Sequence, residues 1–382
     1  MVPSTALHVI DALNIGGAQE LLALLSKWAP PGRNMAVCVL QPRLDAKARL
    51  EANGVPVHAF NRPRPSIFSP FRFLAYIVGN LRDIARLKKK LGADVIHCHL
   101  SDAEFLGILA GRLSGARKVT MTFHTPMLLP ERANGDPRNR LRIWAMRLIY
   151  RRADAVVAVS AETLAALRDV VGIDPARLVL IPNGVDCDDL ASRTPSEKLR
   201  RELGLGPNDR VMLNLGRLVP LKGQIFIIQA LERLADSQPG LKLLIAGDGP
   251  EESVLAGEIA RLGLGDRAFL LGARSDVADL LAISDVVVGA SLWEGTSLAL
   301  MEAMAAGKPL AVTNIPGNRE LLADDVSALM FPPADAPAMA HAVGRLLTEP
   351  ALAERLVRSA QAKARQTFDI RRVVAAYEAL WV

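Results

Sequence analysis

Cysteine is scarce in this chain, and its few copies are scattered. The three thiols are Cys38, Cys98 and Cys187, and no two of them form a CxxC pair. An odd and dispersed set argues against a disulfide framework and against a zinc knuckle, and it indicates a reducing compartment. Such staples are not needed, because 50% of the residues are apolar and can supply full cores.

Long uninterrupted apolar runs are also absent. No stretch approaches the roughly 18 uncharged apolar residues of a membrane-spanning helix. The N-terminal sequence MVPSTALHVIDAL has neither a basic n-region nor a cleavage site, so we expect no signal peptide. These absences argue against secreted and integral-membrane classes. The length of 382 residues favours two domains, since a domain usually holds about 100–200 residues.

Charge is divided unevenly along the chain. Residues 1–185 hold 25 Lys and Arg against 14 Asp and Glu, whereas the remainder holds 21 against 26. The formal net charge of +6 therefore conceals a basic half joined to an acidic half. That asymmetry suggests two modules with different partners, although a drift in isoelectric point without functional meaning is the alternative.

Short apolar runs alternate with amphipathic helical stretches along nearly the whole sequence. The runs are rich in Val, Ile and Leu without strict polar alternation, as expected of strands covered on both faces. Repeated strand–helix units predict an α/β fold with parallel sheets in two Rossmann-like domains. The predicted strands lie at 7–13, 35–41, 55–60, 94–98, 118–123, 155–159 and 178–182, and then at 211–216, 241–247, 268–272, 285–290 and 309–313.

The predicted domain boundary follows Asp186, where the polar stretch CDDLASRTPSE lacks apolar periodicity. We therefore expect an N-terminal domain over 1–186 and a C-terminal domain over 187–368, with a last helix at 369–382 packed back on the first domain. Ligands of open α/β sheets bind outside the carboxyl ends of the strands. Two such sheets facing each other would form a cleft lined by the loops that follow strands.

Two loops of this kind have features suited to a phosphate ligand. Gly16 and Gly17 follow the first strand, and a helix start near Ala18 would offer free N–H groups to an anion. The loop GRLVPLKG, 216–223, carries Arg217 and Lys222, whose charges could converge on a diphosphate. Taken alone, the first pattern also fits a plain tight turn and the second fits two solvated cations.

The sharpest pattern is WEGTSLALMEAMAAGKP, 293–309, in which 297–306 forms a predicted helix. The N–H groups of Ser297 and Leu298 would be unpaired donors at its positive end. Glu294 precedes the helix, and Glu302 lies about one and a half turns in, with its Cβ tilted toward the same end. Carboxylates accept hydrogen bonds, so the pair would hold hydroxyls of ribose and sugar. A capped surface helix is the alternative, but this segment is too apolar for a solvent face.

Three histidines end predicted strands of the first domain. His124 follows a strand in TFHTP and could hydrogen-bond a sugar hydroxyl or stabilise developing charge. His97 and His99 have the HxH spacing that places both side chains on one strand face, as in some metal sites. No carboxylate lies at ligand spacing, and Cys98 is the one thiol nearby, so we predict no metal site.

Together these motifs resemble the family 4 retaining glycosyltransferases. The resemblance spans nearly the whole chain and is strongest over 179–333; each motif is weak alone, but their order and spacing are specific. It implies the GT-B fold, with the nucleotide sugar bound mainly to the second domain, and it implies retention of anomeric configuration without metal or cofactor. The motifs are Glu294-x7-Glu302, GRLxxxKG, Gly16-Gly17-Ala18, PNGVD (182–186), AGDGPE (246–251) and IPGNRE (315–320).

The resemblance also implies roles for single residues. Arg217 and Lys222 would bind the donor diphosphate, aided by the Gly17 backbone. Glu302 would hold the ribose, and Glu294 would hold the transferred sugar near its reacting end.

For the remaining site residues the resemblance implies contacts with the sugar and the base. His124 would contact the O6 side of the sugar and support the oxocarbenium-like transition state, and the residues from Gly272 to Arg274 would meet the base. The residues by themselves indicate electrostatic stabilisation of a diphosphate leaving group.

Two places depart from the family pattern. Residues 324–328, DDVSA, contain no glycine where a DGxxG-like turn is expected, so we expect a different backbone geometry there. The segment GTSLAL stands where an aromatic residue and a glycine are common, which indicates an unusual pocket for the donor sugar. The stretch Asp186-Cys187-Asp188 mimics the DxD motif of metal-dependent transferases, but it lies in the interdomain connection and we interpret it as coincidence.

Two basic segments account for the positive half. Residues 62–90 hold eight basic residues and one acidic, and residues 132–152 hold seven and one, both with aromatic residues interleaved. Such basic amphipathic segments suit an anionic bilayer surface. Apolar residues at 74, 77, 81, 84 and 91 recur at helical spacing, so packing of this stripe on the sheet is the alternative. No nucleic-acid-binding motif accompanies the charge, and we expect no nucleic-acid partner.

The sequence therefore predicts a cytoplasmic enzyme, peripheral at the inner face of the plasma membrane, that moves a hexose from a UDP- or GDP-type nucleotide sugar to a glycan or lipid-linked acceptor. Assembly of a cell-surface polysaccharide or glycolipid is the expected setting. A nucleotide-sugar epimerase of the same fold and a non-catalytic nucleotide-sugar-binding scaffold are the alternatives.

Overall fold

The computed structural model describes residues 5–14, 16–66, 68–124 and 137–382. Several parts of the sequence-based prediction lie outside these ranges. They are the extreme N-terminus, position 15 of the first glycine-containing loop, position 67 of the first basic segment, positions 125–126 of the TFHTP motif, and positions 132–136 of the second basic segment.

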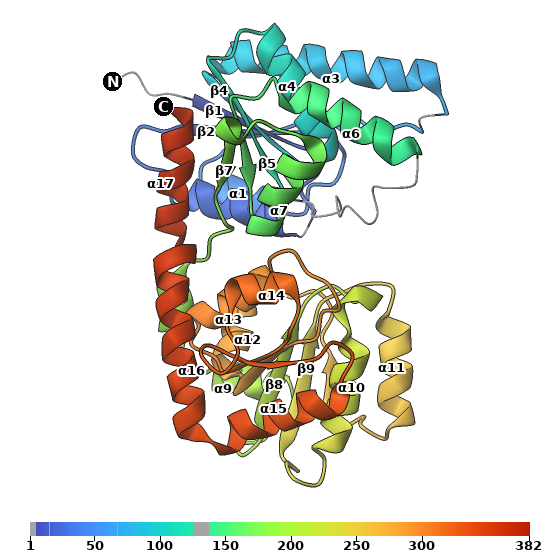
Figure 1. The fold of residues 1–382 in the computed structure, drawn as a ribbon, viewed down its shortest axis with the longest axis vertical. Helices are drawn as coiled ribbons and strands as arrows, with labels where there is room; N and C mark the ends of the chain where they lie inside the picture. Colours follow the sequence, from blue (N-terminus) through green and yellow to red (C-terminus); the bar gives the residue numbers. More distant parts are fainter. Residues whose placement is uncertain (1–4, 15, 67, 125–136) are drawn as a thin grey trace. The chain divides into compact units, whose positions relative to one another are not determined.

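The chain folds into two compact units (Figure 1). The first comprises Met1–Gly184 together with Ile370–Val382, and the second comprises Val185–Asp369. The sequence places the boundary after Asp186, and the structure places it after Gly184. The polypeptide passes from one unit to the other twice, so the first unit is made of two separate stretches of sequence.

The first unit is built on a parallel sheet in the order β3-β2-β1-β4-β5-β6-β7. Its strands are β1 (Thr5–Ile10), β2 (Asn34–Val39), β3 (Val57–Ala59), β4 (Val95–His99), β5 (Lys118–Phe123), β6 (Ala155–Ala158) and β7 (Leu178–Leu180). Its helices are α1 (Gly17–Lys27), α2 (Lys47–Ala52), α3 (Pro70–Leu91), α4 (Ser101–Leu113), α6 (Pro137–Tyr150), α7 (Ala161–Ala166) and α17 (Ile370–Trp381).

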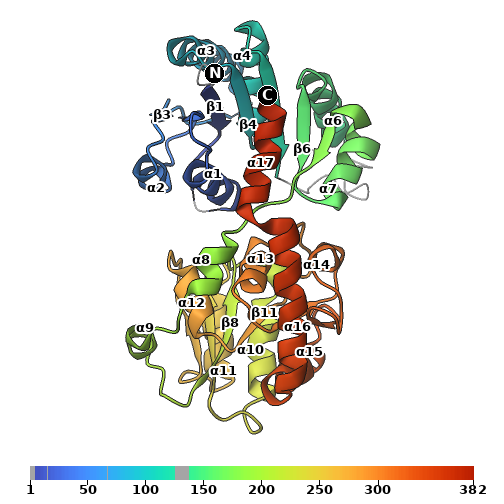
Figure 2. The ribbon, with the colours of Figure 1, turned by 90° about the vertical axis from the view of Figure 1, so that its left-hand side faces the viewer.

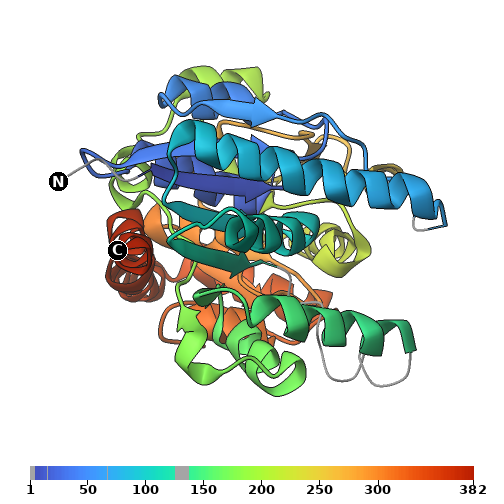
Figure 3. The same cartoon turned by 90° about the horizontal axis from the view of Figure 1, so that it is seen from above.

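Helices cover both faces of this sheet, which is why its strands read as continuous apolar runs. The helices α3, α4 and α6 lie side by side on one face (Figure 3), and alternate strand residues such as Leu7, Ile96 and Val119 pack against them. On the other face α17 lies across the sheet next to α1 (Figure 2). There Val373, Tyr377 and other apolar residues of α17 join a core with α1.

The second unit repeats the plan with a parallel sheet in the order β10-β9-β8-β11-β12-β13. Its strands are β8 (Arg210–Leu215), β9 (Leu241–Ala246), β10 (Ala268–Leu270), β11 (Val286–Gly289), β12 (Leu310–Thr313) and β13 (Leu329–Phe331). Its helices are α8 (Cys187–Ser192), α9 (Glu197–Glu202), α10 (Gln224–Arg233), α11 (Glu252–Arg261), α12 (Val277–Ile283), α13 (Leu298–Ala305), α14 (Pro316–Leu321), α15 (Ala336–Thr348) and α16 (Pro350–Lys363).

Each of the predicted strands is present, with ends that differ by a few residues. The strand β13 was not predicted, because its apolar run is only three residues long and two prolines follow it. Within the described residues no helix is long and apolar enough to cross a membrane.

Asp186 caps α8 by accepting a hydrogen bond from the Asp189 N–H at 3.2 Å, and Asp188 pairs with Arg365 at 2.9 Å. Both carboxylates of the DxD-like stretch therefore have structural partners, which supports the interpretation that its likeness to a DxD motif is a coincidence.

In the glycine-free segment 324–328, Asp325 takes a φ of 52°, the left-handed conformation that a glycine would adopt readily. Aspartate tolerates this region better than most residues, so the turn is kept without glycine.

Candidate functional site

The loop after β8 carries both predicted phosphate ligands. A short 3₁₀ turn, Pro220–Lys222, ends the loop, and Gly223 follows it at the start of α10 with a φ of 64°. The loop is held on the neighbouring strand end, since the Leu218 N–H donates to the Asp248 carbonyl at 2.7 Å. Arg217 of this loop is exposed, and Lys222 is half-buried.

Lys222 and Glu294 are predicted site residues that lie on two different loops, and the fold brings them together as an ion pair. Their side chains are only 21% and 16% exposed, so the pair is screened from water on most sides. The Ser291 hydroxyl donates to the same carboxylate oxygen of Glu294 at 3.1 Å. An ammonium group has three donors, so Lys222 can keep this contact and still bind an oxygen of a ligand.

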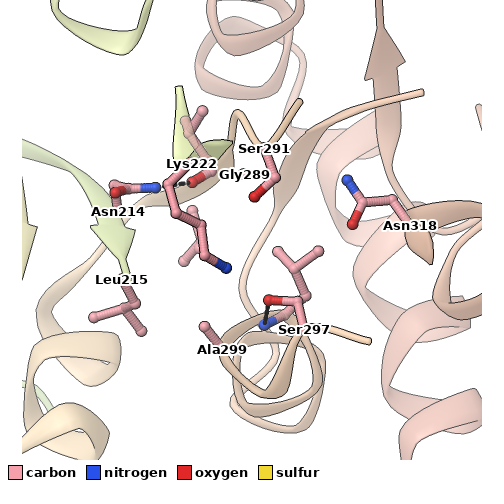
Figure 4. A pocket seen from close by; sticks show the side chains of 11 residues that line it. Asn214, Leu215, Lys222, Gly289, Ser291, Ser297, Ala299 and Asn318 are labelled. Carbon is pink, nitrogen blue, oxygen red and sulfur yellow. Dashed lines mark hydrogen bonds between the residues drawn. The ribbon is translucent and has the colours of Figure 1, made fainter. Parts of the chain in front are cut away.

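The helix α13 begins beside this ion pair. Ser297 is its N-cap residue and accepts a hydrogen bond from the Leu300 N–H at 3.4 Å, so the helix starts at Leu298, one residue after the predicted start. The first N–H groups of a helix have no partner within it, and the helix dipole makes that end positive. Figure 4 shows the Lys222 side chain reaching into a pocket on whose far side Ser297 lies.

This small pocket includes polar residues that the sequence interpretation did not single out. Asn214 donates to the Val288 carbonyl at 2.8 Å, and Asn318 donates to the Thr313 carbonyl at 2.9 Å. Within the described residues, the side-chain oxygens of both asparagines are buried without a hydrogen-bond partner. The sequence does contain a signal for Asn214, because it is the one polar residue inside the apolar run VMLNLG, and a polar residue in a buried strand can mark a binding site. The lining residues are Asn214, Leu215, Lys222, Val287, Val288, Gly289, Ser291, Ser297, Ala299, Leu300 and Asn318.

The backbone of the Glu294 loop is packed tightly against the start of α14. A Cβ atom added at Gly317 would lie 2.1 Å from the Glu294 carbonyl oxygen and 2.4 Å from that of Gly295. Only glycine allows two backbones to approach so closely. Gly317 of the IPGNRE motif therefore fixes the loop that carries Glu294.

The residues proposed for the ribose and the base also lie in the second unit. Glu302 lies on α13, about one turn from its start and half-buried. Gly272 follows β10 and accepts a hydrogen bond from the Gly247 N–H at 2.8 Å, which ties two neighbouring strand ends together. Arg274 pairs with Asp276 at 2.8 Å, and this hydrogen bond lowers the pKa of the Asp276 carboxyl.

In the first unit, the glycine-containing loop and His124 lie at the carboxyl end of the sheet. Gly16 is the N-cap of α1, which begins at Gly17, and both glycines are exposed. His124 directly follows β5 and its Nε2 lies 3.1 Å from His99 Nδ1. Burial lowers the pKa of His124 to about 4, so its ring is neutral at pH 7.

The HxH pair is part of the same buried cluster and both rings have protein partners. His97 lies 2.6 Å from the Thr120 hydroxyl and 2.9 Å from the Thr122 hydroxyl, and His99 bonds His8 and His124. Across the described ranges, no group of three or more His, Cys, Asp or Glu side chains is arranged to hold a metal ion.

Comparisons with known proteins show the family and the fold of the chain. The family model described as glycosyltransferase family 4 matches residues 15–189, and the model described as glycosyl transferases group 1 matches residues 195–363. The UDP-Gal:alpha-D-GlcNAc-diphosphoundecaprenol alpha-1,3-galactosyltransferase of Escherichia coli is 29% identical over 285 residues, which is 72% of this chain and 71% of that protein. The alpha-D-kanosaminyltransferase of Streptomyces kanamyceticus is 29% identical over 88% of this chain and 92% of its own length.

Among solved structures, Anabaena HepE in complex with UDP and glucose superposes with a TM-score of 0.82. It is 25% identical and the match covers 98% of each chain. The lipopolysaccharide outer core galactosyltransferase WaaB has the same fold at a TM-score of 0.68 and 15% identity, over 98% of each chain. Two parallel Rossmann-like sheets, the matching family models and these neighbours lead to one conclusion: the chain belongs to the family 4, group 1 glycosyltransferases of the GT-B fold and is a nucleotide-sugar-dependent hexosyltransferase.

Proposed function

We propose that this enzyme transfers a hexose from a UDP-sugar, with retention of configuration, to a lipid-linked or glycan acceptor at the cytoplasmic face of the membrane. The observation that carries the donor assignment is the Lys222–Glu294 pair beside the start of α13. A cation, a carboxylate and a positive helix end are the groups that a diphosphate next to a sugar needs. The names of the relatives support the UDP-sugar and the lipid-linked acceptor.

In the proposed reaction, the bond between the anomeric carbon and the diphosphate oxygen breaks while the acceptor oxygen bonds that carbon and passes its proton to an oxygen of the departing diphosphate. Negative charge grows on the departing diphosphate, where Lys222, Arg217 and the α13 start stabilise it. Groups already fixed in place stabilise such charge without reorganising, and among enzymes such stabilisation is usually the largest single contribution to the rate. Glu294 and Glu302 accept hydrogen bonds from sugar and ribose hydroxyls.

Gly16 and Gly17 are the proposed backbone contacts of the diphosphate in the first unit, and His124 is the proposed contact of the sugar. In the second unit, the N–H groups of Ser297 and Leu298 face the diphosphate in this proposal, and Gly272 to Arg274 face the base. No metal or other cofactor takes part in the proposed reaction.

Substitution of the ion pair tests the donor site. We expect Lys222→Ala and Glu294→Ala each to lower kcat by at least about 100-fold, as loss of a preorganised charge does in other active sites. Glu258→Ala is the matched control, because Glu258 is also a largely buried carboxylate paired with a base, Arg261 at 2.7 Å, but on α11. Turnover equal to wild type in either site variant, with the fold intact, would refute the assignment.

The donor base is tested separately by thermal stability. A ligand that binds only the folded enzyme raises Tm in proportion to the logarithm of its concentration. We expect UDP-sugars to raise Tm more than GDP- and ADP-sugars at equal concentration, and the Lys222→Ala variant to lose this response. A larger shift with GDP-sugars would contradict the UDP assignment.

The membrane part of the proposal stands on exposed apolar side chains on α3, on α6 and directly before α3, which we call the α3–α6 patch. Phe71 is 87% exposed and Trp144 is 59% exposed. Exposed Arg72, Arg140 and Arg142 lie next to them in the sequence. Apolar and cationic side chains together fit an anionic bilayer surface. The patch comprises Phe68, Phe71, Leu74, Val78, Leu141, Trp144 and Leu148.

Only part of the apolar stripe in the first basic segment is exposed enough to contact a membrane. Of the apolar stripe in the first basic segment, Ile84 is buried, and Ile77, Leu81 and Leu91 pack against the core. Most of the stripe therefore serves the fold, as the alternative interpretation holds, and Leu74 is the one member that joins the patch.

Vesicle flotation tests the α3–α6 patch. We expect the enzyme to float with phosphatidylcholine vesicles that contain about one third phosphatidylglycerol, and the Phe71→Ser/Trp144→Ser variant to remain in solution. Leu113→Ser is the control, since Leu113 is 78% exposed but ends α4. Absence of flotation for the wild type, or equal flotation for the double variant, would end the membrane proposal.

A further inference from the structure

Three histidine rings of the first unit form a hydrogen-bonded chain that ends at His124. His8 Nδ1 lies 3.1 Å from His99 Nε2, and His99 Nδ1 lies 3.1 Å from His124 Nε2. The ring planes are inclined by only 17° in the first pair and 29° in the second, with centroids 5.4 Å apart, as hydrogen bonds between the ring edges require. The chain runs from β1 through β4 to the residue after β5, and these three strands are neighbours in the sheet.

Strand register explains why the rings meet. His8 pairs in register with His97, and Ile10 pairs with His99, across the parallel β1–β4 ladder. Side chains two residues apart share a face of a strand, so His8, His97 and His99 all point to the face that α17 covers. The ring of His8 contacts the edge of Trp381 at 5.2 Å between centroids, which places the inner end of the chain beneath that helix.

All three rings are neutral at pH 7. Burial, with a smaller contribution from the Arg33 charge, lowers the pKa of His8 to about 3, and burial lowers that of His124 to about 4. Burial likewise holds the pKa of His99 well below its usual value. A neutral imidazole has one donor nitrogen and one acceptor nitrogen. The two hydrogen bonds then allow only two arrangements, with the protons of all three rings on Nδ1 or all three on Nε2.

The inner end of the chain decides between the two arrangements. Within the described residues, His8 Nε2 is buried and has no hydrogen-bond partner. A proton on that nitrogen would leave a buried N–H unpaired, which is rare in folded proteins. Arg33, which is paired with Glu378 at 2.7 Å, lines the same small cavity as His8. Glu378 lines this cavity too, but Arg33 is the charge that acts on the His8 ring, and a positive charge favours a lone pair over an N–H there. Both observations place the proton of His8 on Nδ1.

With His8 protonated on Nδ1, each following ring must also carry its proton on Nδ1. His8 then donates to His99 Nε2, and His99 donates to His124 Nε2. The outer nitrogen of His124, Nδ1, has no hydrogen bond within the described residues and is left as an N–H donor at the carboxyl end of the sheet.

We propose that His8 and His99 are positioning residues that fix His124 as the Nδ1–H tautomer, so that His124 offers the sugar an N–H donor and cannot act as a base through that nitrogen. The identity of the sugar as its acceptor rests on the proposed function, whereas the tautomer does not. A donor fixed in this way matches a sugar oxygen, which is an acceptor, without any rearrangement of the ring during the reaction.

Nitrogen NMR of the full-length enzyme with ¹⁵N-labelled histidine reads the tautomer directly, and single His→Phe variants assign the six histidines. We expect His8, His99 and His124 each to show a protonated Nδ1 and an unprotonated Nε2 at pH 7. A proton on Nε2 of His124 in the wild type would overturn the proposal, and this measurement needs neither donor nor acceptor.

Two variants separate positioning from a purely structural role. In His99→Phe we expect the fixed tautomer of His124 to be lost and kcat to fall by about tenfold, because a misplaced catalytic group lowers the rate. His97→Phe is the matched control: His97 is equally buried and its ring lies 4.6 Å from that of His99, but it bonds Thr120 and Thr122 instead of His124. We expect it to lower Tm while the His124 spectrum stays unchanged.

The outcomes keep the proposal and the proposed function apart. An unaltered His124 tautomer in His99→Phe would contradict positioning. An Nδ1 proton on His124 combined with full turnover in His124→Phe would uphold the positioning chain and contradict the sugar contact. Neither result bears on Lys222 and Glu294.

Discussion

Substitution of Gly317 by alanine provides a sharp test of how the donor loop is held. The added methyl group would lie 2.1 Å from the Glu294 carbonyl oxygen, where a tolerable contact is about 3 Å, so the loop must move by about 1 Å. Overpacking of this kind costs about 1–3 kcal/mol of folding free energy. A shift of about 1 Å in a group that orients substrate also costs about 100-fold in rate.

Urea denaturation and steady-state kinetics measure both effects. We expect Gly317→Ala to lower the free energy of unfolding by about 1–3 kcal/mol with an unchanged m value, and to lower kcat about 100-fold. Gly257→Ala is the matched control on α11, because nothing lies within 4 Å of its added Cβ and alanine favours a helix by about 1 kcal/mol. If Gly317→Ala is as stable and active as Gly257→Ala, the tight contact does not hold the loop.

Two further predictions concern pH. Because burial lowers the folded-state pKa of His8 to about 3 and of His124 to about 4, the unfolded chain binds protons below about pH 6.5 while the folded chain does not. Urea titrations at pH 7, 6 and 5 should therefore show a free energy of unfolding that decreases as the pH is lowered. An increase on lowering the pH would refute this. Burial raises the pKa of Glu104 to about 8, so its contribution to stability falls as pH rises from about 4.5 to 8. Because the Glu104 contribution opposes that of the histidines, Glu104→Gln should make the gain in stability from pH 5 to 7 steeper, and an unchanged slope would contradict this.

The sheets could be predicted because their strands are apolar on both faces. Runs such as residues 118–123 and 241–247 are long enough to stand out from the helices around them. A run of three residues, as in β13, is too short to do so. The start of α13 was predicted to within one residue because Ser297 has the chemistry of a cap.

The candidate site was predictable where a motif follows a strand, and less so where register sets the neighbours. Lys222 and Glu294 belong to loops after adjacent strands, so their meeting could be expected from the carboxyl-end rule. His8 lies 91 residues from His99, and only the alignment of β1 with β4 brings them together. A single sequence carries no signal for that register.

The passage of the chain into the second unit and back has a consequence for synthesis. The helix α17 covers one face of the first sheet, yet it leaves the ribosome only after the whole of the second unit. Until then Val95, Val157 and Ile181 lack their partners from α17. Exposed apolar strands of a nascent domain are prone to aggregation. The first unit, although it is synthesised first, can therefore complete its fold only last, and one face of its sheet stays without the α17 cover until translation reaches the end of that helix.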